Sequence, residues 1–261
     1  MKTSLPRLEA GLLLTMVLAV LGACLGPAVA QHAHYHAFAD QRAWGGLPYA
    51  MDVLSNVPFA MGGIWGLLTL QRLHVGLGVN WQRPLATLFF AGLIVTALCS
   101  GYYHGRPDNA SLLVDRLGMV VAFAGLLGLA AADRVSARAG VATACVVLLL
   151  GALAVRVWAL SGNLLPWVVL QAGGLVLMLL LARCKVIAGA WGIRLGAVVA
   201  VYIVAKLLEL GDHLVFDATA GLVSGHSLKH MVAALVAWPV ISAMHNVPIQ
   251  NLKKMRRLRE F

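Results

Sequence analysis

Charged side chains are scarce in this chain of 261 residues. Asp, Glu, Lys and Arg together make up 11% of it, whereas hydrophobic residues make up 61%. This composition is too apolar for a water-soluble domain of this size. The few charges stand between apolar runs of about 20 residues, the length that an α-helix needs to cross the hydrocarbon core of a bilayer. The sequence therefore predicts an all-α, multi-pass membrane protein.

Other features are absent as well. Segments of about ten residues with alternating polarity, typical of a membrane β-barrel, do not occur. There is no low-complexity tract and no sign of a second domain. The cysteines form no CxxC pair and lie in or beside apolar segments, so we interpret them as small packing residues. They are Cys24, Cys99, Cys145 and Cys184.

Seven apolar segments follow the amino-terminal region and predict a bundle of seven transmembrane helices over residues 50–246. Because the connections are short, neighbouring helices should be antiparallel. Residues 31–49 are expected to form an outer loop, and residues 247–261 a basic cytoplasmic tail. The predicted segments are 50–71, 85–104, 111–131, 139–158, 165–183, 190–210 and 228–246.

Residues 1–30 allow three interpretations. An apolar run from Gly11 to Cys24, preceded by basic residues and followed by Ala28-Val29-Ala30, fits a cleaved signal peptide. The same run fits an extra transmembrane helix that remains in the protein. The sequence Leu21-Gly22-Ala23-Cys24 also fits a lipoprotein signal. All three interpretations place Gln31 on the outer side.

The positions of Lys and Arg predict the orientation. With the amino terminus inside, most of the 20 basic residues fall on the inner side, as expected for cytoplasmic loops. The net charge of +10 therefore has a topological explanation and does not predict nucleic-acid binding. In this orientation most acidic residues lie outside, together with every histidine except His74 and His245.

Five of the outer polar residues have the spacing of a metal site. Ser100 and His104 lie one helical turn apart at the end of one segment, and Asp115 begins the next. His226 and His230 are also one turn apart, where the last segment begins. Three neutral imidazoles with one open position are typical of a catalytic zinc site. Asp115 could then hold or deprotonate a zinc-bound water, and Ser100 could donate to a developing oxyanion.

Other interpretations of these residues remain. Polar residues are common at interfacial helix ends, so a histidine pair four residues apart is a weak signal by itself, and membrane histidines also bind haem. A receptor-like or transport bundle with a structural metal would need no catalytic group. Lys206, Glu209 and Asp212 are expected to form an ion-pair network that fixes helix rotation, or else to orient a histidine through its second ring nitrogen.

The first bundle helix begins with three polar residues. Asp52, Ser55 and Asn56 are expected to cap this helix and to form hydrogen bonds to neighbouring helices.

The pattern of site residues resembles that of the alkaline ceramidase family, part of a wider superfamily of seven-helix membrane hydrolases that includes the adiponectin-type receptors. The motifs are Ser100-x3-His104, Asp115 eleven residues later, and His226-x3-His230 in the last helix. Longer stretches are similar to those of bacterial members, and the resemblance spans about residues 35–246. These stretches are 35–42, 52–56 and 206–209.

The resemblance implies that the three histidines bind zinc and that the serine and the aspartate assist hydrolysis of a ceramide-like amide. The products would be a sphingoid base and a fatty acid, although another lipid amide or ester is a further candidate substrate. The only partners implied are the lipid bilayer and this membrane lipid, ceramide or a related N-acyl lipid; no obligate protein partner is inferred.

The resemblance also bears on location and on a second metal. It implies a bacterial inner membrane. Together with the orientation predicted from Lys and Arg, this places the site near the periplasmic face and the carboxyl terminus in the cytoplasm. Eukaryotic members of the family have an acidic, amino-terminal calcium site. Here Asp40 and Asp52 lie in that region without a glutamate, which leaves calcium open.

Overall fold

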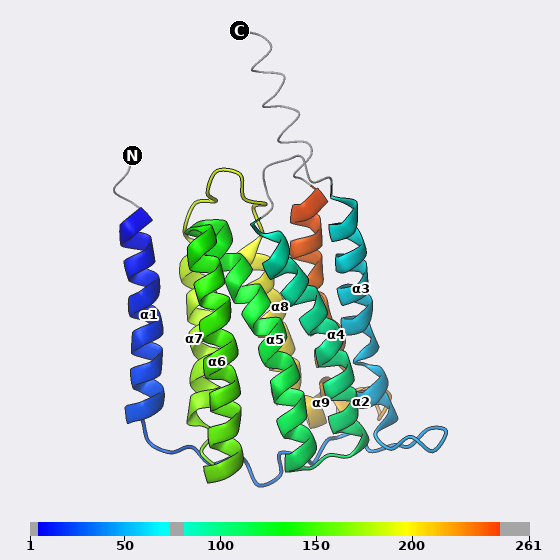
Figure 1. Cartoon of the computed structure of the whole chain (residues 1–261). Helices are drawn as coiled ribbons and strands as arrows, with labels where there is room; N and C mark the ends of the chain where they lie inside the picture. The colour runs from blue at the N-terminus through cyan, green and yellow to red at the C-terminus, as the bar shows by residue number, and fades with distance from the viewer. Residues whose placement is uncertain (1–4, 74–80, 246–261) are drawn as a thin grey trace.

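The computed structural model describes residues 5–73 and 81–245, and this part of the chain is helical without a β-strand (Figure 1). The long helices run side by side in alternating directions, as the short connections predict. The helices are α1 (Leu5–Leu25), α2 (Ala50–Leu54), α3 (Val57–Arg72), α4 (Arg83–Gly105), α5 (Asn109–Arg134), α6 (Ala137–Ser161), α7 (Leu165–Ala182), α8 (Leu195–Leu210), α9 (Asp212–Ala218) and α10 (Gly225–Ala234).

Within the described residues, seven helical stretches are long and apolar enough to cross a membrane. The amino-terminal helix α1 is one of them, and it packs against α7 at the edge of the bundle (Figure 1). The predicted segment 190–210 corresponds to α8, which has 16 residues and is shorter than the other predicted spans. The prediction of an all-α, membrane-type bundle is thus confirmed.

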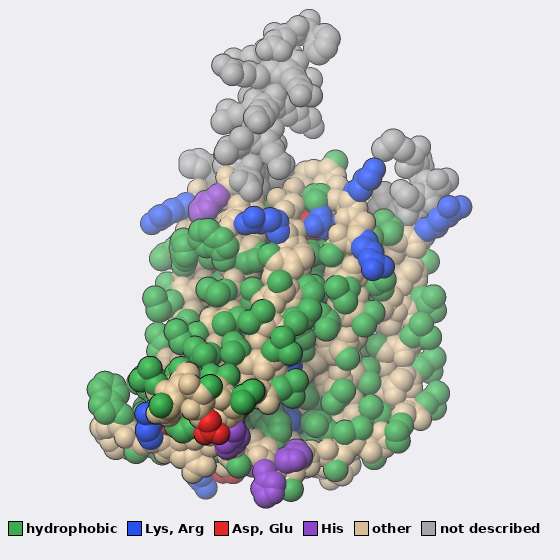
Figure 2. Space-filling view, turned by 180° about the vertical axis from the view of Figure 1, so that it is seen from behind, with side chains coloured by type: hydrophobic (Ala, Val, Ile, Leu, Met, Phe, Trp, Pro, Cys, Tyr) green, Lys and Arg blue, Asp and Glu red, His purple; other side chains and the backbone are tan. Residues whose placement is uncertain are grey.

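The two ends of the bundle differ in charge. Hydrophobic side chains form a band around the middle, and Lys and Arg dominate one end (Figure 2). Most of the visible histidine and acidic side chains lie at the opposite end, together with some basic ones, and one histidine is seen at the basic end (Figure 2). The beginning of α1 and the end of the last helix both lie at the basic end (Figure 1). The proposed basic tail, residues 247–261, and His74 lie outside the described residues.

Proline breaks two of the spanning stretches. The turn at Ser55 and Asn56 separates α2 from α3, and Pro58 is the second residue of α3. A second turn, at residues 235–236, interrupts the last span three residues before Pro239. Proline has no N–H, and its ring clashes with the carbonyl group four residues earlier, so a regular helix cannot continue through these points. The first break lies directly beside the candidate site.

Helices α4 and α5 pack closely and are joined by a short turn. A Cβ atom on Gly125 would lie only 2.3 Å from the backbone nitrogen of Phe89, so this close approach requires a glycine. The Asp108 side chain accepts a hydrogen bond from the backbone N–H of Ser111 at 2.7 Å, and the Ser111 hydroxyl donates to the carbonyl of Arg106 at 2.6 Å. The end of α4 is thereby fixed beside the beginning of α5.

Candidate metal centre

Three histidines from two helices converge at the end of the bundle opposite the basic end. His104 lies in the last turn of α4, and His226 and His230 lie one turn apart in α10. They are 1%, 7% and 4% exposed, and their ring centroids are 4.8 to 4.9 Å apart. One ligand nitrogen from each lies within 4.8 Å of the other two. The sequence spacing thus predicted this cluster correctly.

The spacing of these nitrogens fits a tetrahedral metal ion. Metal–nitrogen bonds of about 2.0–2.1 Å place two tetrahedral ligands about 3.3 Å apart. The Nε2 atoms of His104 and His226 are 3.3 Å apart. The nitrogen that His230 offers lies within 4.8 Å of these two. Among residues 5–73 and 81–245, this is the one group of three or more ligand side chains close enough to hold an ion.

A serine from the helix break orients the third histidine. Nδ1 of His230 lies 2.8 Å from the Ser55 hydroxyl, which itself donates to the backbone carbonyl of Asp52 at 2.9 Å. Since that hydroxyl proton is already used, Ser55 accepts the proton of Nδ1 and leaves Nε2 of His230 free to bind a metal. The expectation that Ser55 forms a hydrogen bond to another helix is confirmed.

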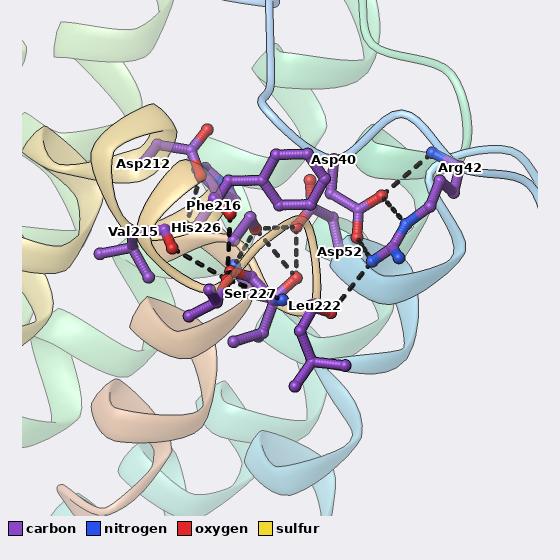
Figure 3. Close-up of polar contacts among 12 residues, drawn as sticks. Asp40, Arg42, Asp52, Asp212, Val215, Phe216, Leu222, His226 and Ser227 are labelled. Carbon is purple, nitrogen blue, oxygen red and sulfur yellow. Dashed lines mark hydrogen bonds and ion pairs between the residues drawn. The ribbon is translucent and has the colours of Figure 1, made fainter.

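The beginning of α10 is held by a glycine and an aspartate. A Cβ atom on Gly225 would lie 2.3 Å from the carbonyl oxygen of Leu208, so only glycine allows this contact between α10 and α8. Asp212 accepts a hydrogen bond from the backbone N–H of His226 at 2.8 Å and another from that of Ala39 at 3.0 Å. Figure 3 shows this carboxylate beside α10. Asp212 therefore joins α9, α10 and the outer loop.

An aromatic side chain from the outer loop covers the histidines. The Phe38 ring centroid lies 4.8 Å from that of His104 and 4.5 Å from that of His226, and Phe38 is 4% exposed. Nearby, Nδ1 of His36 lies 2.9 Å from the Tyr103 hydroxyl and ties the loop to α4. The sequence analysis missed Phe38, because one aromatic residue in a loop carries no metal-binding signal.

Ser100 and Asp115 lie on the wall of a cavity of about 200 Å³ that also touches His230. Both side chains are buried, and Oδ1 of Asp115 has no hydrogen-bond partner among the described residues. A carboxylate oxygen is thus available on the wall of this cavity, much of which is apolar. The apolar wall includes Phe89, Leu93, Met119, Phe123, Met178 and Val199.

An ion-pair network borders the same cavity. Glu209 pairs with Lys206 through Oε2 and with Lys229 through Oε1, the latter at 2.9 Å. Nζ of Lys229 also lies 3.0 Å from Nε2 of His226. The expected network of Lys206 and Glu209 is present, whereas Asp212 is not a member and Lys229 is. Only the folded arrangement of α8 and α10 identifies Lys229, whose neighbours along the chain gave no such signal.

Comparison with other proteins assigns no family to this geometry. The chain matches no protein-family model and no curated protein. The features shown are a helical bundle of membrane type and a buried group of three histidines that could bind a metal ion.

Asp40 and Asp52, the two acidic residues on which a calcium site would depend, differ in their partners. Both oxygens of Asp40 accept hydrogen bonds from Arg42, at 2.8 and 2.6 Å, and this guanidinium lowers the pKa of the Asp40 carboxyl (Figure 3). Oδ1 of Asp52 accepts a hydrogen bond from Ser227 at 2.7 Å. Arg42 thus already supplies the positive charge next to Asp40, whereas Oδ2 of Asp52 has no hydrogen-bond partner among the described residues.

Proposed function

We propose that the protein is a zinc-dependent membrane hydrolase, resembling the bacterial-type alkaline ceramidases, that cleaves the amide bond of ceramide-like lipids. One observation carries this proposal: three buried histidine nitrogens converge, and one of these histidines, His230, lines the same cavity as Ser100 and Asp115. Three imidazoles with an open position are typical of catalytic zinc. Bound zinc would supply a water of low pKa and would polarise the amide carbonyl.

The side chains around the histidines have distinct roles in this proposal. Asp115 accepts a proton from the attacking water, and its unpartnered Oδ1 is the available base. The Ser100 hydroxyl donates to the carbonyl oxygen as negative charge develops there. Asp115 then passes the proton to the leaving nitrogen as the C–N bond breaks. The products are a fatty acid and a sphingoid base.

The position of the site suits a lipid substrate. The histidines lie near one end of the bundle, and we expect this end to lie at the depth of the amide of a membrane lipid. The cavity extends from His230 toward the middle of α4 and α5. An acyl chain can therefore occupy the cavity while its amide group lies at the histidines. With the basic end in the cytoplasm, the site faces the periplasm.

Haem binding is a weaker explanation of the same residues. A porphyrin between two axial histidines would need the space that the third imidazole and Phe38 fill. We therefore expect no Soret band in the purified protein. A structural metal in a receptor-like or transport bundle remains the competing function.

The variant Asp115→Asn separates a catalytic site from a structural one. It is nearly isosteric and keeps all three histidines, but it removes the proposed base. We expect zinc content and thermal stability close to those of the wild type and at least a 100-fold loss of ceramide hydrolysis. The matched control is Asp217→Asn, an exposed aspartate at the same end of the bundle. Equal hydrolysis by Asp115→Asn and wild type would contradict the proposed mechanism.

A further inference from the structure

The polar end of the cavity carries more charge than the proposed hydrolysis uses. Lys206 and Glu209 of α8 and Lys229 of α10 line the cavity together with Asp115 and His230. Each of the three network side chains keeps some accessible surface. Ionisable groups at this depth are costly and usually have a function. Neither lysine has a role in the steps above.

The two lysines share one carboxylate. Oε1 of Glu209 pairs with Lys229 and Oε2 pairs with Lys206, so both oxygens are used. Lys229 has a further contact, at 3.0 Å, with Nε2 of His226. That nitrogen cannot bind a metal and accept a proton from an ammonium group at the same time. Binding of a metal therefore frees one N–H donor of Lys229.

The charge balance of the cavity wall points to an anionic ligand. Without a metal, the two lysines are balanced by Glu209 and Asp115. A divalent ion held by neutral histidines adds two positive charges, and the described residues of the cavity wall include no further carboxylate. The next carboxylates, Asp52 and Asp212, lie off this wall and accept hydrogen bonds from Ser227 and from backbone N–H groups. Uncompensated charge is expensive in an apolar cavity. A ligand with a negatively charged group would restore the balance and would accept the free N–H donors.

We infer that the lipid substrate carries an anionic oxygen group, a carboxylate or a phosphate, near its amide, and that Lys206 and Lys229 bind this group. This inference rests on the proposed hydrolase function and narrows its substrate class. N-acyl amino acids have a carboxylate next to the amide, and phosphorylated N-acyl lipids have a phosphate a few bonds further away. Both kinds of lipid would place anionic oxygen acceptors beside the ammonium donors of the lysines. Hydrogen bonds between charged groups are stronger than those between neutral groups.

The test uses pairs of substrates in which one member has an anionic group that the other lacks. In the first pair, N-palmitoylglycine has a carboxylate where N-palmitoylethanolamine has a hydroxymethyl group. In the second pair, ceramide 1-phosphate has a phosphate that ceramide lacks. The full-length, zinc-loaded protein in detergent is assayed for hydrolysis and for the thermal shift that each lipid causes. We expect about a 10- to 100-fold preference for the anionic member of one pair, as hydrogen bonds to charged groups give. Preference for the anionic member of the first pair would indicate a carboxylate, and preference for that of the second pair would indicate a phosphate.

Variants of one lysine show where the preference arises. Lys206→Met should lower the ratio of anionic to neutral hydrolysis toward one, and Lys206→Arg should keep it. Lys185→Met, at an exposed loop position between α7 and α8, is the matched control and should behave as wild type.

Two results would overturn the inference. Equal or faster hydrolysis of the neutral member in both pairs would refute an anionic substrate and leave the hydrolase function intact. If no amide is hydrolysed, the hydrolase function fails, and the thermal shift decides about the ligand. Stronger stabilisation by the anionic lipids, lost in Lys206→Met, would support the inference. Equal stabilisation by charged and neutral lipids would refute it.

Discussion

Replacing Ser55 by alanine should weaken metal binding without removing any ligand. Ser55 accepts the Nδ1 proton of His230 at 2.8 Å, and this contact selects the tautomer whose Nε2 faces the other histidines. In Ser55→Ala the buried Nδ1–H loses its acceptor. The Asp52 carbonyl keeps its bond from the Asn56 side chain at 2.8 Å, so the loss is confined to the histidine.

The size of the effect follows from this single lost contact. A buried donor without an acceptor costs about 1–3 kcal/mol, and removing a group that orients a metal-binding histidine weakens metal affinity by about 10- to 100-fold. Every 1.4 kcal/mol corresponds to about a factor of ten, so the two estimates agree. We expect a zinc dissociation constant for Ser55→Ala that is about 10- to 100-fold higher than that of the wild type.

The assay is a competition titration against a zinc-binding dye at neutral pH, with purified protein in detergent. The matched control is Ser161→Ala, which removes an exposed hydroxyl bonded to the carbonyl four residues earlier in α6. This control should bind zinc as the wild type does. Unchanged zinc affinity in Ser55→Ala would refute the assignment of Ser55 as the group that orients His230.

Two further predictions concern the surroundings of the site. Gly225→Ala should lower thermal stability and zinc affinity, because its Cβ would lie 2.3 Å from the Leu208 carbonyl oxygen. The control Gly196→Ala, where a Cβ meets no atom within 4 Å, should change neither. Equal melting temperatures for Gly225→Ala and wild type would contradict this prediction. Arg42 holds the pKa of Asp40 below its usual 3.8, so the pair stabilises the fold above about pH 4 and loses this effect as the pH falls through the lowered pKa. The difference in melting temperature between wild type and Arg42→Met should therefore shrink below pH 4, and a difference that grows there would refute it.

The helices and the histidine cluster could be predicted from the sequence because both depend on local spacing. Apolar runs of bilayer length mark the spans, and residues four apart share one helical face. His104 and Asp115 were expected to be neighbours because only a short turn separates their helices. The orientation predicted from Lys and Arg placed His226 and His230 at the same end of the bundle as His104. The structure confirms that these three histidines lie together.

The parts of the site that the sequence did not predict depend on contacts between distant segments. Phe38 covers the histidines from a loop whose path is set by Asp212, which lies far along the chain. Lys229 joins the network only because α10 packs against α8. The exclusion of Asp212 from that network has the same origin, since its oxygens face backbone N–H groups and no lysine. Local spacing carries no information on such contacts.

The most direct test of the account is the metal content of the purified protein. Wild type, His226→Ala and the control His213→Ala, an exposed histidine at the same end, are purified in detergent and analysed by mass spectrometry for bound elements. We predict about one zinc ion per chain in wild type and His213→Ala, as for a single three-histidine site, and none in His226→Ala. Absence of zinc from the wild type after supplementation, or equal zinc in His226→Ala, would contradict the account.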